Sequence, residues 1–99
     1  MTKKEFREKI ALAREYLVYR KWDGKRRGVC EALGFAFDTY FDEVGSVPNT
    51  FRLIFSPERP SMYWLGDRDI DNQETLDNRR DFLNHFEEYM VVNQYYLAY

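Results

Sequence analysis

The pattern of apolar and polar positions along the chain predicts three amphipathic helices. In the first, over about residues 2–20, the apolar residues recur at steps of four, three and four, which places them on one face. These residues are Phe6, Ile10, Ala13 and Leu17. Thr2 and Glu5 have the spacing of a capping box, in which each side chain binds a backbone N–H of the first turn.

A second helix is predicted over about residues 25–44, after a turn at Asp23-Gly24. Its apolar face consists of Cys30, Leu33, Phe37, Tyr40 or Phe41, and Val44. Gly28 and Gly34 lie inside this pattern, and we expect another helix or an aromatic ring to approach closely there. Because a short turn joins the first two helices, we expect them to form an αα-hairpin.

The last helix is predicted to start near Asp71 or Asn72, which are good N-cap residues. Its apolar face consists of Leu76, Leu83, Phe86 and Met90. Residues 91–99 either extend this helix or form a strand, because they are rich in β-branched and aromatic residues. Residues 46–65 fit a short helix followed by an extended stretch, or two strands around a turn with two prolines.

The predicted fold is therefore mainly α, with a helical hairpin, a final long helix and a short irregular or two-stranded segment in the middle. The alternative is an α+β fold. The length of 99 residues fits a single domain over residues 1–99. No apolar stretch approaches the roughly 20 residues of a membrane span, and no export signal is recognisable. With a single cysteine, we expect a cytoplasmic protein that makes no membrane contact.

The composition is unusual in its aromatic residues. The chain has 8 Phe, 8 Tyr and 2 Trp, against 17 Leu, Ile and Val together. Nine rings remain after the predicted apolar faces are filled: Tyr16, Tyr19, Trp22, Phe35, Tyr63, Trp64, Tyr95, Tyr96 and Tyr99. We expect Phe35 and Trp64 to close the core as a second aromatic layer. The others favour a protein-binding surface or a homodimer contact, where Tyr and Trp are enriched.

Charge is distributed unevenly along the chain. Residues 1–30 contain ten basic and four acidic side chains, whereas residues 31–99 contain five basic and thirteen acidic ones. One explanation is that the basic first helix lies on the acidic last helix. The other is that the two halves carry separate binding surfaces.

A basic turn precedes the predicted second helix and supports one functional alternative. Its residues are Lys21, Trp22, Lys25, Arg26 and Arg27. The N-terminus of a helix favours phosphate, and a tryptophan can stack on a base. The alternative prediction is therefore a small protein that binds a nucleotide or a nucleic acid. The order of residues is not that of a P-loop.

The acidic residues between positions 67 and 81 support the preferred alternative, a surface that docks onto a basic partner. They are Asp67, Asp69, Asp71, Glu74, Asp77 and Asp81. Tyr95, Tyr96 and Tyr99 would add contact area to this surface. The first three aspartates resemble the start of an EF-hand loop, but Asn72 and Asn78 stand where glycine and glutamate are needed. We therefore expect no metal and no cofactor.

The sequence offers little catalytic chemistry. Cys30 and His85 form a conceivable nucleophile–base pair, but Cys30 lies on an apolar face, where a buried thiol is unreactive. The sequence contains no G-x-S-x-G, H-E-x-x-H or C-x-x-C motif. We expect a protein that is not an enzyme.

Three short segments, residues 27–33, 63–65 and 78–83, read RGVCEAL, YWL and NRRDFL. Together they resemble a loose group of small bacteriophage-encoded proteins, in which a helical hairpin precedes a Trp-Leu segment and a final helix. The resemblance implies an accessory role in which the protein binds and inhibits a host protein or a defence complex. It implies no catalytic residue.

Overall fold

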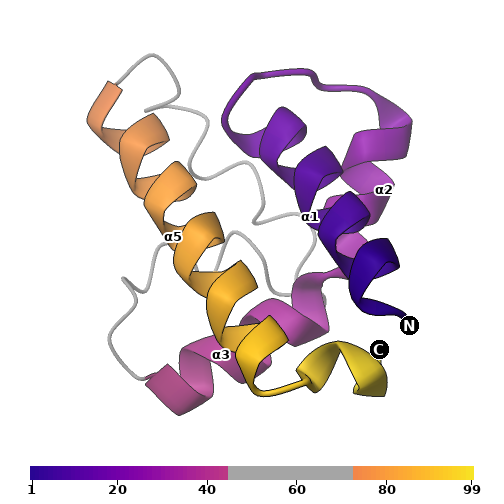
Figure 1. Ribbon diagram of the computed structural model, residues 1–99. Coiled ribbons are helices and arrows are strands. Elements are labelled where there is room, and N and C mark those ends of the chain that lie inside the picture. Colours follow the sequence, from indigo (N-terminus) through magenta and orange to yellow (C-terminus); the bar gives the residue numbers. More distant parts are fainter. Residues whose placement is uncertain (45–72) are drawn as a thin grey trace.

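The computed structural model describes residues 1–44 and 73–99, and in these parts the chain is helical without any strand (Figure 1). The elements are α1 (Lys3–Leu17), α2 (Gly24–Ala32), α3 (Gly34–Val44), α5 (Gln73–Val92) and the 3-10 helix η2 (Tyr95–Ala98). The prediction of a mainly α fold is confirmed. The two readings of residues 46–65, and with them Tyr63 and Trp64, lie outside the described residues. No helix in the described ranges is both long and apolar enough to cross a membrane.

Helix α1 forms as its sequence pattern predicts. The Thr2 hydroxyl accepts a hydrogen bond from the Glu5 N–H at 3.1 Å, and the Glu5 carboxylate accepts one from the Thr2 N–H. These two bonds satisfy N–H groups that the first turn of a helix leaves free. The four residues of the predicted apolar face are all buried, and Tyr16 is buried beside them.

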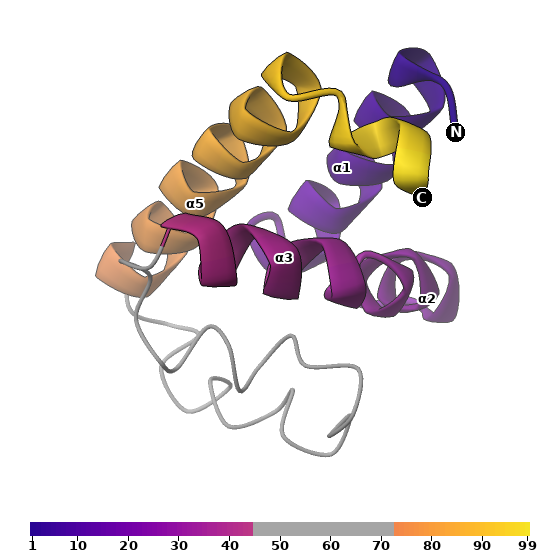
Figure 2. The same cartoon turned by 90° about the horizontal axis from the view of Figure 1, so that it is seen from below.

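The prediction of a single helix over residues 25–44 is wrong, because the chain forms two helices there, α2 and α3 (Figure 2). Leu33 separates them with a ψ of −4°, far from the helical value of about −42°. Gly34, a poor helix former, follows and is buried. The predicted hairpin is present, since α2 packs along α1. No close neighbour explains Gly28, because a Cβ there would meet nothing within 4 Å.

Helix α5 packs against both α1 and α3 and closes an aromatic core. Its predicted apolar face is buried, together with Phe82. The ring of Phe86 lies 4.7 Å from that of Phe37, and the ring of Phe82 stacks on Phe41 at 5.2 Å. The core is built largely from rings, as the composition indicates.

Oppositely charged side chains connect α1 and α5. Arg7 and Arg14 lie 3.6 and 3.5 Å from the Glu87 carboxylate, and Arg14 donates a hydrogen bond to Asn84 at 2.9 Å. Part of the uneven charge distribution is therefore balanced inside the molecule, by a basic first helix lying against the last one.

The C-terminal segment neither extends α5 as a regular helix nor forms a strand. Helix α5 ends at Val92, and Gln94 takes a left-handed conformation with a φ of 58°. The chain then turns into η2, which lies near the start of α1 (Figures 1 and 2). The ring of Tyr96 packs there against Phe6 at 6.3 Å.

Candidate functional site

Several large aromatic side chains remain on the surface of the described residues. Phe35 and Tyr19 are 62% and 61% exposed, and Trp22 and Tyr99 are also exposed. The expectation that Phe35 closes the core is wrong, because its position on α3 turns it away from the buried face of Phe37 and Phe41. Exposed rings of this size are typical of binding surfaces.

One side of α5 forms a stripe that is half-buried at its first residue and exposed at the other four, which we call the α5 outer face. Its residues follow each other at steps of four, four, three and four, and so lie above one another on the helix. They are Asp77, Asp81, His85, Glu88 and Val92. Arg80 lies beside this stripe and pairs with Asp77 at 3.1 Å and with Asp81 at 4.0 Å. The outer face therefore carries three carboxylates and one adjacent guanidinium.

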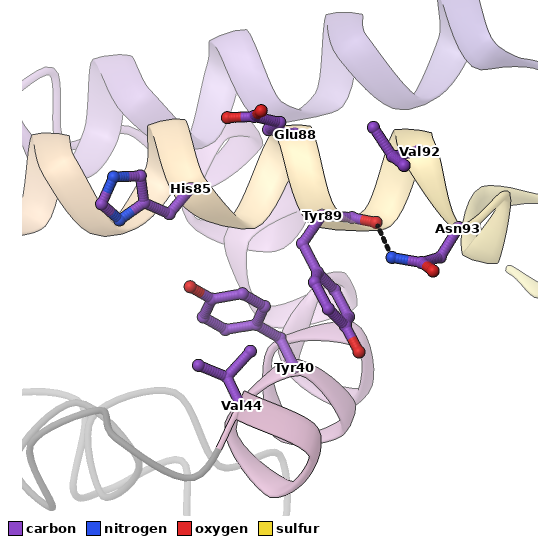
Figure 3. Close-up of a pocket in the computed structure, with 7 residues that line it drawn as sticks. All are labelled: Tyr40, Val44, His85, Glu88, Tyr89, Val92 and Asn93. Carbon is purple, nitrogen blue, oxygen red and sulfur yellow. Dashed lines mark hydrogen bonds between the residues drawn. The ribbon is translucent and has the colours of Figure 1, made fainter.

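The α5 outer face leads into a pocket of about 370 Å³ between α3 and α5 (Figure 3). The pocket is lined by Tyr40 and Val44 from α3 and by His85, Glu88, Tyr89, Val92 and Asn93. The rings of Tyr40 and Tyr89 meet edge to face, with centroids 5.5 Å apart. A small apolar hollow with a few polar groups is the usual form of a ligand or side-chain pocket.

Tyr40 is the most buried polar residue of this pocket. Its side chain is only 6% exposed, and its hydroxyl extends beneath α5 toward His85 (Figure 3). The hydroxyl makes no hydrogen bond with any residue that the structure describes. Burial raises the pKa of Tyr40, so that its hydroxyl keeps its proton at neutral pH.

A second group of tyrosines borders the pocket and holds the C-terminal segment in place. The hydroxyls of Tyr89 and Tyr95 both donate hydrogen bonds to the Glu43 carboxylate on α3. These two bonds lower the pKa of Glu43. The bond between Tyr89 and Glu43 also raises the pKa of Tyr89 to about 12. The hydroxyl of Tyr99 bonds to Thr39 at 2.7 Å.

The residues predicted to dock onto a partner are placed as follows. Asp81 is exposed and Asp77 half-buried on the α5 outer face. Tyr95 and Tyr96 are half-buried and pack inward, whereas Tyr99 is exposed. Asp67, Asp69 and Asp71 and the side chain of Glu74 lie outside the described residues. The EF-hand-like loop lies there too, and the described residues contain no group of metal-ligating side chains.

The basic turn has an internal structure that opposes its predicted role as a phosphate site. The Asp23 carboxylate accepts the Arg26 N–H at 2.7 Å and so caps the N-terminus of α2, where a phosphate would bind. The Arg26 guanidinium also binds Glu15 at 2.6 Å, and Arg27 binds Glu31 at 2.9 Å.

The remaining residues of the basic turn are more open. Lys21 lies 3.9 Å from Glu15, and Trp22 and Lys25 are exposed. The structure thus leaves the nucleic-acid alternative with fewer available cations than the sequence indicates, because carboxylates of this chain already bind both arginines.

Cys30 lies in the core, and its burial raises the pKa of the thiol to about 12. A thiol in that state is protonated at neutral pH and is a poor nucleophile. His85, the proposed base, lies exposed on the α5 outer face. The geometry therefore gives no support to a Cys–His pair.

The sequence analysis did not predict the pocket, although the residues of α5 that lead into it have a regular helical spacing. The spacing of the α5 outer face can be read from the sequence alone. The position of Tyr40 opposite this face cannot, because it depends on how α3 and α5 pack. Comparisons with protein-family models, curated proteins and solved structures found no match.

Proposed function

We propose that this chain is a non-enzymatic protein-binding module that docks onto a basic surface of a partner protein. The observation that carries this proposal is the α5 outer face, an exposed acidic stripe that leads into a pocket with aromatic walls. Complementary charge accelerates association and orients the partner, and aromatic side chains supply contact area.

The proposed partner is a bacterial host protein or a host defence complex, and the chain is then a bacteriophage accessory protein that inhibits it. Support for this finer proposal comes from the resemblance of residues 27–33, 63–65 and 78–83 to phage-encoded proteins. In mechanism, the carboxylates of Asp77, Asp81 and Glu88 would occupy a basic groove that normally receives nucleic acid.

The proposal is tested by affinity capture from bacterial lysate with the wild-type chain and with an Asp77→Asn/Asp81→Asn variant. We expect the wild type to recover a defined partner at low salt, with less recovery as salt rises, because salt screens exposed charges. The double variant should recover much less of the same partner. Glu8→Gln, an exposed glutamate on α1, serves as the matched control and should behave like the wild type.

Two results would contradict the proposal. One is a wild-type chain that recovers no partner at low salt. The other is a partner whose recovery is the same for the double variant and the control, because the α5 outer face would then play no part in binding.

A further inference from the structure

We infer that the pocket between α3 and α5 receives an arginine side chain of the partner protein. This inference rests on the proposed function and identifies the chemistry that the partner presents to the α5 outer face. Three features of the pocket support it: its ring walls with their apolar rim, the Tyr40 hydroxyl, and the sign of its charge.

The first feature is the pair of rings in the pocket wall. Tyr40 and Tyr89 meet at an interplanar angle of 76°, so their faces point in different directions. Tyr40 packs against rings of the core, and Tyr89 stacks on Tyr95 with centroids 6.0 Å apart. The remaining half-buried surface of Tyr89 is therefore the part of the wall that a planar guanidinium can contact, by cation–π attraction and by simple planar contact. Val44 and Val92, which are both exposed at the rim, can pack against the apolar stem of the same arginine.

The second feature is the Tyr40 hydroxyl. It extends toward His85 into the pocket, and no hydrogen bond to another described residue is formed there (Figure 3). The oxygen stays accessible to solvent, because within the described ranges it is not one of the buried polar side-chain atoms that lack a hydrogen bond. The Tyr40 oxygen can therefore accept an N–H of a guanidinium that enters the pocket, in exchange for water.

The third feature is the sign of the charge around the pocket. Among the described residues that line it, none is Lys or Arg, and Glu88 lies at its edge (Figure 3). Glu43 binds the hydroxyl of Tyr89, so a second carboxylate lies just beyond the wall. Helix α5 also ends at Val92, and the C-terminus of a helix carries a partial negative charge. The pocket thus favours a cation over an anion.

Arginine fits these features better than lysine does. Its flat fork offers several N–H donors at once, so that it can bind the Tyr40 hydroxyl while its charge is favoured by Glu88 at the pocket edge. Its guanidinium is also less strongly hydrated than an ammonium group, which lowers the cost of entering a pocket with apolar walls. Lysine and neutral side chains become the comparison ligands of the test.

The test is an NMR titration of the ¹⁵N-labelled full chain with N-acetyl-arginine amide. N-acetyl-lysine amide and N-acetyl-citrulline amide, the neutral isostere, are the comparison ligands. We expect the arginine ligand to shift the amide signals of Tyr40, Val44, His85, Glu88 and Tyr89, with a weak dissociation constant, and the two comparison ligands to bind less tightly.

Two substitutions with matched controls make the test specific. Tyr40→Phe removes only the unpartnered hydroxyl, and Glu88→Gln removes only the charge, so neither disturbs a contact that the fold needs. Each should weaken binding of the arginine ligand about three- to ten-fold, the size of effect expected for losing one ordinary hydrogen bond or one solvent-exposed charge contact. Tyr19→Phe and Glu8→Gln change exposed residues elsewhere and should leave binding unchanged.

The inference is overturned if citrulline or lysine amide binds as tightly as arginine amide. It is also overturned if the shifts scatter over the whole surface, or if Tyr40→Phe binds like the wild type. These outcomes are separable from failure of the proposed function. Loss of partner capture in the Asp77→Asn/Asp81→Asn variant without arginine binding would refute the pocket assignment alone. Arginine binding without any captured partner would refute the proposed function.

Discussion

At the scale of single residues, Arg79 on α5 shows how a charged side chain can complete an apolar face. It is 3% exposed, and its Nη1 donates a hydrogen bond to the Leu17 carbonyl at the end of α1. The predicted apolar face of α5 includes Leu76 and Leu83, which are seven positions apart. Arg79 lies between them at steps of three and four, so it falls on the same face of the helix. The helical periodicity therefore marks position 79 as part of the buried face, although arginine is rarely buried in proteins.

We expect Arg79→Met to destabilise the fold by about 1–3 kcal/mol, because it keeps an apolar stem but leaves the Leu17 carbonyl without its charged donor. Urea denaturation measures the change. Arg80→Met is the matched control: Arg80 is exposed and makes only surface ion pairs, so its loss should cost less than about 1 kcal/mol. Equal effects of the two substitutions would contradict the structural role given to Arg79.

At the scale of elements, the start of α2 depends on Asp23. Its carboxylate accepts the Arg26 N–H and binds the Arg26 side chain. These contacts lower the pKa of Asp23. The same cap explains why the sequence pattern of a basic helix start does not produce an open anion site, since the chain supplies its own carboxylate.

Replacement of this cap by Asp23→Ala should destabilise the protein by about 1 kcal/mol, the usual effect of losing an N-cap side chain. Thermal denaturation followed by circular dichroism measures the loss. Lys25→Ala, an exposed position on the same helix, should change the stability much less. A stability of Asp23→Ala equal to that of the wild type would show that α2 does not need the cap.

The attachment of η2 to α3 should depend on pH through Glu43. Its folded-state pKa is lowered by the hydrogen bonds from Tyr89 and Tyr95. The stabilisation is therefore fully present above the unfolded-state pKa, near 4.5, and is lost as the pH falls through the lowered value. At the alkaline end, the stabilisation from Tyr89 is lost as the pH rises toward about 12.

This pH dependence can be measured by NMR from the side-chain signals of Tyr95. In the wild type, we expect these signals to report loosening of η2 below about pH 4.5. In Glu43→Gln, which cannot change its charge, this acid step should be absent. An acid step of the same size in both proteins would assign the pH dependence to other groups.

At the scale of the whole molecule, local periodicity predicted much and packing between distant segments decided the rest. The faces of α1 and α5 and the capping box followed from residue spacing alone. The break at Leu33 did not, because apolar residues continue at helical spacing across it. The exposure of Phe35 and the pocket at Tyr40 depend on how α3 meets α5, which no single segment encodes.

The charge distribution also depends both on the local sequence and on how the helices pack. The excess of positive charge in residues 1–30 is partly balanced by Glu87 of α5, which lies beside two arginines of α1. Within the hairpin, Glu15 also binds Arg26.

Along the α5 outer face, by contrast, the guanidinium of Arg80 lies beside both Asp77 and Asp81. With Glu88 the face carries three carboxylates, so negative charge remains in excess there. This difference is the physical reason to place the docking surface on α5 rather than on the basic turn.

The most direct test of the docking surface is site-specific photo-crosslinking in bacteria that express the chain. A benzophenone amino acid is placed at Asn78, an exposed position beside the α5 outer face that leaves its carboxylates intact, or at Glu8, on the exposed side of α1. We predict one discrete adduct with a partner from position 78, weakened by Glu88→Gln, and none from position 8. No adduct from position 78, or the same adducts from both positions, would contradict the assignment of the binding surface.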